Sequence, residues 1–240
     1  MMLDYLRLEV RRTLRDTGFV IGGIAMPVMM YLLFTNLGGG DDGEWRTASM
    51  VGMAAYGAVG SALNTGGGVA EDKVIGWLRQ LRVTPMTPRE VVVGRALTGS
   101  VTVLPAITAV LAAGGLVNGV RLDPWQWAAI AVLLWLGSVP FTLLGLGNGY
   151  RLTAQTTGVA NMVCNLGLSV VGGLWFPLEL FPDRLRSLAV YTPTNRFAQL
   201  GVSVADGHAP AAGGVAVLMA WLLAFGSYAV FAYRRSARTV

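Results

Sequence analysis

The sequence predicts an all-α membrane protein with six transmembrane helices, folded as a single domain over residues 1–240. One observation is composition: 54% of the 240 residues are hydrophobic and 13% are charged, whereas about a quarter of an average soluble domain is charged. The other is that the charges leave six uncharged windows of 24 to 27 residues, at 17–40, 47–70, 96–120, 124–150, 152–178 and 207–233. Because roughly 20 apolar residues of helix cross the bilayer core, each window can form one span.

The basic residues near the ends of these windows predict their orientation. With the N-terminus inside, the segments 1–16 and 71–95, Arg151 and the tail from Arg234 hold 13 of the 18 Lys and Arg residues. This distribution follows the positive-inside rule, so we expect both termini in the cytoplasm. Basic residues at the ends of spans, rather than on one folded face, indicate a lipid bilayer as partner and no nucleic acid. Seventeen arginines beside one lysine are typical of a GC-rich bacterial genome, which indicates the bacterial plasma membrane.

The N-terminal segment 1–16 is expected to form an amphipathic helix in the headgroup region. Leu3, Leu6, Val10 and Leu14 follow helical spacing, and four arginines occupy the other side. A solvated tail is the alternative. The first span then runs from about Thr17 to Asn36, with a kink expected at Pro27.

The longest cytoplasmic connection, whose coupling region is 71–86, predicts a short amphipathic helix. Glu71 and Asp72 suit a helix N-terminus, while apolar and basic residues of this stretch fall on different faces. The apolar stripe consists of Val74, Trp77, Leu78 and Leu81, and the basic residues are Arg79 and Arg82. Thr87 then provides an N-cap and Pro88 a first helical residue, so the third span is expected to begin near Pro88.

Three further connections are expected. Asn118–Pro124 forms a tight outer turn, and Asn148–Thr157 a short polar link on the cytoplasmic side. The outer segment 176–206 is rich in prolines and apolar residues, which favours short or re-entrant helices over a free loop. The last span follows, and basic residues after Tyr233 hold its end inside.

The inventory of reactive residues excludes most catalytic sites. One cysteine, Cys164, and one histidine, His208, cannot form a zinc or iron–sulfur site or an internal disulfide. The only lysine, Lys73, is followed by Val74, so a phosphate-binding Gly-Lys-Ser/Thr motif is missing. Because no Asp, Glu, Lys or Arg lies within a window, and the one histidine, His208, is expected in the outer loop, a membrane enzyme and ion-coupled transport are disfavoured.

Uncharged polar residues do occur inside the windows. Asn64 lies in the second window, and Asn161 and Asn165 lie in the fifth. Such residues form hydrogen bonds between helices in many membrane proteins. The alternative is that these three line a transport pathway.

Two motifs carry a resemblance to a known family. The first is Gly-Trp-Leu-Arg-Gln-Leu-Arg-Val-Thr-Pro at 76–85, ahead of the third window. The second is Gly-Leu-Trp-Phe-Pro-Leu-Glu at 173–179, followed by Pro182 and by Tyr-Thr-Pro at 191–193. With these motifs in this order among six windows, the whole chain resembles the permease subunits of type 2 ATP-binding-cassette (ABC) transporters. That family includes bacterial drug, antibiotic and polysaccharide exporters.

The resemblance implies that ATP is bound by one protein chain and that the transported molecule crosses the membrane through another. A separate ABC ATPase, the nucleotide-binding subunit, would bind ATP and Mg, whereas this chain would bind no cofactor and would not itself be an enzyme. The residues implied in ATPase coupling are Glu71, Trp77, Leu78, Arg79, Leu81 and Arg82. Phe176, Pro177 and Glu179 are implied at an outer gate. A second permease copy, or a related permease in a heterodimer, would complete the path.

Two functions follow as hypotheses. The first is the transmembrane subunit of an ATP-driven exporter that moves a hydrophobic or amphiphilic compound, such as a drug, an antibiotic or a lipid, out of the cell. The uncharged windows favour such cargo. The second is a non-transporting membrane anchor, or a signalling or immunity partner, that holds a cytoplasmic protein.

Overall fold

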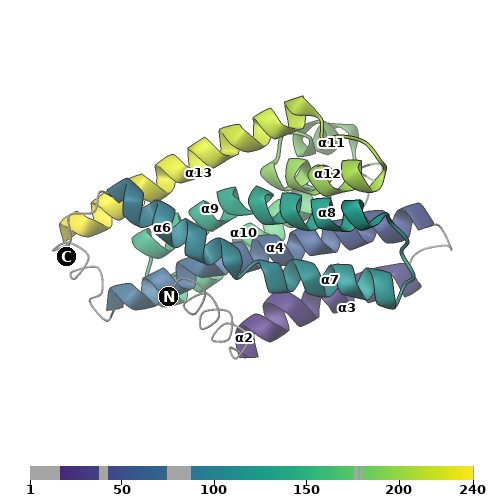
Figure 1. Ribbon diagram of the computed structural model, residues 1–240. Coiled ribbons are helices and arrows are strands. Elements are labelled where there is room, and N and C mark those ends of the chain that lie inside the picture. Colours follow the sequence, from purple (N-terminus) through teal and green to yellow (C-terminus); the bar gives the residue numbers. More distant parts are fainter. Residues whose placement is uncertain (1–16, 38–42, 75–87, 176–177, 179–180, 240) are drawn as a thin grey trace.

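The computed structural model describes residues 17–37, 43–74, 88–175, 178 and 181–239, and the regular elements within these ranges are helices (Figure 1). In chain order they are α2 (Thr17–Phe19), the π-helical turn η1 (Val20–Ala25), α3 (Met26–Leu37), α4 (Gly43–Val74), α6 (Pro88–Val101), α7 (Leu104–Leu116), α8 (Pro124–Gly137), α9 (Val139–Arg151), α10 (Ala154–Val171), α11 (Asp183–Ala189), α12 (Pro193–Ala205) and α13 (Ala212–Thr239). The helix expected at 1–16 lies outside the described residues.

Three helical stretches in the described part are long and apolar enough to cross a membrane: Arg89–Leu116, Pro124–Arg151 and Ala212–Ser236. A shorter apolar helix covers Val20–Asn36. The α4 and α10 helices are long too, but glycine, serine, threonine and asparagine make them less apolar. The all-helical prediction is therefore confirmed for the described residues, while the number of spans stays a prediction.

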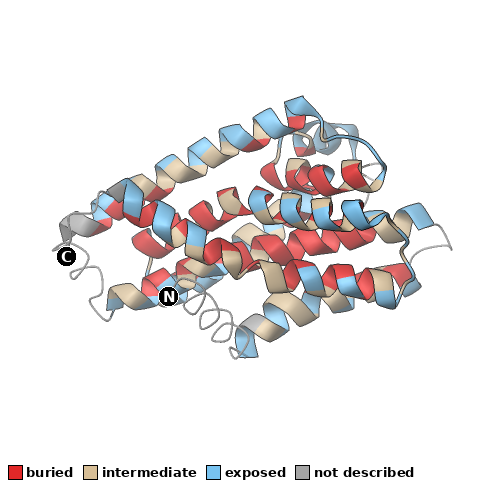
Figure 2. Ribbon diagram, viewed as in Figure 1, coloured by how far each residue is buried: buried red, intermediate tan, exposed pale blue. Residues whose placement is uncertain are grey.

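The central helix of the bundle is α4. It contacts α3, α7, α9, α10 and α12, and its residues from Ser49 to Val59 are all buried (Figure 2). Most of these residues are small, which lets neighbouring backbones approach closely. This burial explains the composition of α4, because a helix covered by other helices does not need large side chains that face lipid.

Two of the three long stretches are broken into half-helices. Thr102 and Val103 separate α6 from α7, and Ser138 separates α8 from α9. Each second half has a proline at its second position, Pro105 or Pro140, where the missing backbone N–H disrupts the preceding turn. The indole N–H of Trp135, near one break, donates to the carbonyl oxygen of Ser100, near the other, at 3.0 Å.

The first helix is irregular next to Pro27, where the sequence predicts a kink. The π-helical turn η1 ends directly before the turn that contains Pro27. Because proline has no N–H, the carbonyl of Gly23 has no partner four residues on, and a wider turn is a recognised response. Gly57 of α4 makes room for this proline, since a Cβ on Gly57 would lie 3.0 Å from Pro27 Cγ.

The expectation that Glu71 and Asp72 begin a separate helix is wrong. Both lie in the last turn of α4, which continues to Val74. Contacts distant in sequence hold this turn: Asp72 forms an ion pair with Arg95 of α6, and Lys73 donates to carbonyls at the end of α9. The remaining coupling residues, within 75–87, lie outside the described residues.

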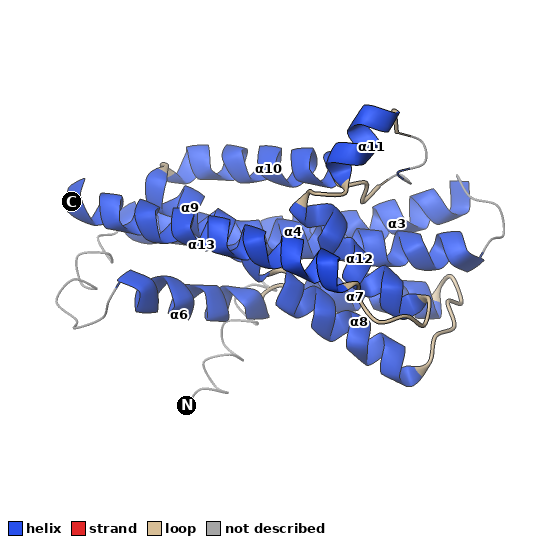
Figure 3. Cartoon of the chain, turned by 90° about the horizontal axis from the view of Figure 1, so that it is seen from above, coloured by secondary structure: helices blue, strands red, loops and turns tan. Residues whose placement is uncertain are grey.

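The connections gather at two opposite ends of the bundle (Figures 1 and 3). The end of α4, the start of α6, the link from α9 to α10 and the end of α13 lie at one end. The turn from α7 to α8 lies at the other end, as do α11 and α12, two short helices within the predicted outer segment 176–206. The link from α9 to α10 is shorter than the predicted Asn148–Thr157, because α9 continues through Asn148 to Arg151.

Candidate functional site

The structure brings Asn64, Asn161 and Asn165 to the wall of one cavity. This asparagine cleft, of about 430 Å³, is lined by Gly18, Gly22, Gly23, Met26, Tyr56, Gly60, Ser61, Leu63, Asn64, Gly67, Gly158, Asn161, Met162, Asn165 and Leu166. The residues come from the irregular first helix, from α4 and from α10. None of these described lining residues carries a formal charge.

Glycines give the cleft its space. Six of its lining residues are glycines, and they occur on each of the helices that form it. At Gly60 the requirement is direct, because a Cβ there would lie 2.9 Å from Nδ2 of Asn165. A larger residue at this position would push the Asn165 amide into the cavity or displace α10.

Asn161 is held by a chain of hydrogen bonds across four helices. Its Nδ2 donates to the carbonyl oxygen of Leu63 on α4 at 2.7 Å, and its Oδ1 accepts from Nδ2 of Asn148 on α9 at 2.8 Å. Oδ1 of Asn148 accepts in turn from the hydroxyl of Tyr228 on α13 at 3.0 Å. Asn161 is only 7% exposed, so its amide ties the wall of the cleft together.

The side chains of Asn165 and Asn64 are less fully hydrogen-bonded or less buried than that of Asn161. Oδ1 of Asn165 is buried and has no hydrogen-bond partner in the described part of the chain, and the same holds for the hydroxyl oxygens of Ser61 and Thr65. The side chain of Asn64 is exposed. Of the three predicted pathway residues, Asn64 is thus the one that is exposed at the cleft, whereas the protein covers Oδ1 of Asn165.

Two residues of this network, Asn148 and Tyr228, were not among the sequence candidates. Asn148 was assigned to a polar link, although an asparagine inside the uncharged window 124–150 is the same signal that identified Asn161. Tyr228 gave no such signal, because a tyrosine within an apolar helix is ordinary. Only the packing of α13 against α9 brings its hydroxyl to Asn148.

The predicted coupling and gate residues are mostly outside the described ranges. Glu71 is described and exposed at the end of α4. Trp77, Leu78, Arg79, Leu81 and Arg82, and the gate residues Phe176, Pro177 and Glu179, lie outside the described residues. Leu174 and Trp175, which immediately precede the predicted gate, line a second cavity at the end of the bundle where α11 and α12 lie.

Comparison with known proteins agrees with this architecture. The sequence model of the ABC-2 type transporter family matches residues 5–203. The protein of Bacillus subtilis (strain 168) named "Putative transport permease YvfS" is 27% identical over 222 residues, which cover 90% of each chain. The chain belongs to the ABC-2 type transporter family, and it is a transmembrane subunit of an ABC transporter.

Proposed function

We propose that this subunit exports a hydrophobic or amphiphilic compound, such as a drug, an antibiotic or a lipid, through the asparagine cleft. The observation that carries the proposal is the lining of that cleft: it is uncharged, and the amides of Asn165 and of the exposed Asn64 belong to its wall. An uncharged wall with a few amides suits a molecule that is mostly apolar and carries some polar groups. Fixed charges for an ionic cargo are missing from this described lining.

The family pairs this subunit with an ABC ATPase. In the proposal the ATPase binds ATP and Mg, while Glu71 and the residues from Trp77 to Arg82 receive its movement. In the same proposal the chain crosses the plasma membrane of a bacterial cell six times, and both of its termini lie in the cytoplasm. The grouping of connections at two opposite ends of the bundle supports this topology.

A second permease, identical or related, would close the cleft on its open side. Support comes from the exposed apolar residues of α10 beside it: Val159 is 60% exposed, Met162 65% and Val163 63%. Met162 also lines the cleft, so a partner packed on this face would form the opposite wall. Phe176, Pro177 and Glu179 would then lie near the outer opening.

The experiment is reconstitution of the subunit with its ATPase in liposomes, with the neutral dye Nile red and a short-chain fluorescent phosphatidylcholine as probes. We expect ATP-dependent movement of at least one probe, and loss of that movement with Asn165→Leu. Gln155→Leu is the matched control, since Gln155 is an exposed residue of α10 that does not line the cleft.

Two outcomes would contradict the proposal. Equal transport by Asn165→Leu and Gln155→Leu would remove the cleft from the pathway. A complex that hydrolyses ATP and moves neither probe would favour the other hypothesis, a membrane anchor or a signalling or immunity partner.

A further inference from the structure

A groove on the outside of the bundle runs between α6 and α13 and has a volume of about 480 Å³. We call it the arginine groove. Arg89, Val92 and Val93 of α6 line one side, seven residues of α13 between Leu222 and Arg234 line the other, and Leu143 of α9 completes the lining. The groove shares no lining residue with the asparagine cleft, so the two sites can be tested separately.

Most of the arginine groove is apolar and open to its surroundings. Val93 is 54% exposed, Leu223 68% and Phe231 61%. Both helices belong to stretches that are long and apolar enough to cross a membrane, Arg89–Leu116 and Ala212–Ser236. In a membrane-spanning subunit the surroundings of these side chains are therefore the hydrocarbon chains of lipids.

The proposed second permease leaves this face of the bundle open. Val159, Met162 and Val163, against which it would pack, belong to α10. In Figures 1 and 3, α6 and α10 lie on opposite sides of α9 and α13. The position of the arginine groove thus favours a lipid over a second copy of the chain as its occupant.

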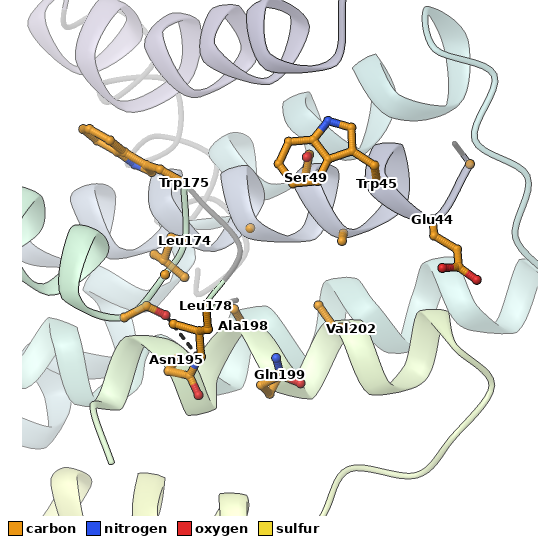
Figure 4. A pocket seen from close by; sticks show the side chains of 15 residues that line it. Glu44, Trp45, Ser49, Leu174, Trp175, Leu178, Asn195, Ala198, Gln199 and Val202 are labelled. Atoms are coloured by element: carbon orange, nitrogen blue, oxygen red, sulfur yellow. Dashed lines mark hydrogen bonds between the residues drawn. The ribbon is translucent and has the colours of Figure 1, made fainter. Parts of the chain in front are cut away.

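Two positive charges lie at one end of the groove. Arg89 is in the first turn of α6 and Arg234 is near the end of α13, and both side chains are exposed. No Asp or Glu belongs to the described lining, and the described residues give neither guanidinium an ion-pair partner. The second cavity, between α4 and α12 (Figure 4), has no Lys or Arg among its described lining residues, and the asparagine cleft has none among its own. The arginine groove therefore differs from both in joining an apolar wall to a site for an anion.

The length of the groove matches one leaflet of a bilayer. Its apolar part extends from Leu222 to Phe231 of α13, about 14 Å at the rise of an α-helix. Half of the hydrocarbon core of a bilayer is about 15 Å thick. Arg234 follows Phe231 after about one helical turn, at the depth where the headgroups of that leaflet begin. One acyl chain can thus lie along the groove while the phosphate of the same lipid meets the arginines.

We propose that the arginine groove binds an anionic phospholipid. The lipid phosphate accepts hydrogen bonds from the guanidinium groups of Arg89 and Arg234, whose planar N–H donors match phosphate oxygens, and an acyl chain lies between α6 and α13. Basic pockets between transmembrane helices bind anionic headgroups in this way. With the orientation proposed above, the lipid belongs to the cytoplasmic leaflet. The site goes beyond the export path, and its occupancy needs neither ATP nor transport.

The test is photolabelling of the full-length subunit, assembled with its ATPase in nanodiscs of phosphatidylcholine. The probe is phosphatidylglycerol with a diazirine in one acyl chain, and peptide mass spectrometry locates the label. We expect saturable labelling within 89–93 and 222–231. Unlabelled phosphatidylglycerol should displace the probe. Phosphatidylethanolamine with the same acyl chains, which has no net charge, should not displace it, and neither should inorganic phosphate at matched ionic strength.

Substitutions test the two parts of the groove. Arg89→Gln and Arg234→Gln should each raise the mole fraction of probe that half-saturates the labelling about fivefold, the effect of one basic residue near the membrane surface. Arg151→Gln is the matched control, because Arg151 is exposed at the same end of the bundle and does not line the groove. Ser227→Trp, at an exposed lining position, should abolish the labelling by filling the apolar part.

Unfolding temperatures of the variants identify any that fail to fold. Displacement by phosphatidylethanolamine as effective as that by phosphatidylglycerol overturns the proposal, because the groove would then be an ordinary contact with lipid. Displacement by inorganic phosphate would make the arginines a site for a soluble anion. Equal effects of Arg151→Gln and Arg89→Gln would assign the preference to the overall charge of this end. Label elsewhere on the subunit but not in these two peptides would mean that protein covers the groove.

Discussion

Gly66 of α4 and Gly145 of α9 pack backbone against backbone, so closely that a Cβ added to Gly66 would lie 1.9 Å from the carbonyl oxygen of Gly145. The contact is reciprocal along the two helices, because a Cβ on Gly149 would lie 2.1 Å from the carbonyl oxygen of Gly66. Neither atom is the end of a flexible side chain that could move aside. The approach of α4 to α9 therefore depends on glycine at these positions.

Replacing Gly66 with alanine should destabilise the protein strongly. The added methyl group must separate α4 from α9, and overpacking of this kind typically costs about 1–3 kcal/mol and occasionally more. Thermal unfolding of the purified protein in detergent measures the effect. Gly158→Ala is the control, because a Cβ there has open space and alanine favours the helix by about 0.5–1 kcal/mol. Similar unfolding temperatures for the two variants would show that α4 and α9 are not packed as described.

Replacing Asn161 with leucine should lower stability by about 1–3 kcal/mol for each buried group that loses its partner. The groups concerned are the Nδ2 of Asn148, which loses its acceptor, and the carbonyl of Leu63, which loses a donor. Asn64→Leu changes an exposed asparagine in the same cleft and should leave the unfolding temperature nearly unchanged. The opposite order of the two variants in thermal unfolding would contradict the hydrogen-bond chain.

Replacing Trp135 with phenylalanine should cost about 1 kcal/mol, the value of one hydrogen bond. The lost bond is the one from the indole to the carbonyl of Ser100, which links the breaks in two long helical stretches. Thermal unfolding again measures the change, with Trp125→Phe as a control on an exposed tryptophan. If both variants unfold at the wild-type temperature, this bond contributes nothing to holding the two breaks together.

The sequence predicted the all-helical architecture and singled out three of the residues that line the cleft, because both depend on local patterns. Uncharged windows identify apolar helices, and asparagines inside them stand out, as Asn64, Asn161 and Asn165 do. The break at Ser138 could not be predicted this way. The spacing of charges gives the ends of a window, but it carries no information about a break in the helix inside that window. Pro140 was the available signal for it.

Other features depend on partners far along the chain. Glu71 and Asp72 match the pattern of a helix start, but Arg95, 23 residues beyond Asp72, pairs with it and holds it in the last turn of α4. The acceptors of Lys73 are 76 to 79 residues away. No local pattern of residues contains such contacts, so the end of α4 could be placed only with α6 and α9 in view.

Replacing Lys73 with methionine should destabilise the junction between α4 and α9. The ammonium donates to the carbonyl oxygens of Leu152 at 2.7 Å and of Tyr150 at 3.3 Å, at the end of α9 where a cation also interacts favourably with the helix dipole. Methionine keeps most of the apolar chain but donates no hydrogen bond. We expect a loss of about 1 kcal/mol in thermal unfolding at neutral pH, with Lys73→Arg closer to wild type.

The pH dependence of this difference has a definite sign. Burial lowers the pKa of the Lys73 ammonium below its ordinary value of 10.5, so between the lowered value and 10.5 the unfolded chain binds more protons than the folded one. Wild-type stability relative to Lys73→Met should therefore rise as pH increases toward 10.5. Paired unfolding measurements of the two proteins from neutral pH to pH 10.5 test this. A gap that narrows with rising pH would mean that the carbonyl and helix-dipole contacts of the Lys73 ammonium outweigh its desolvation.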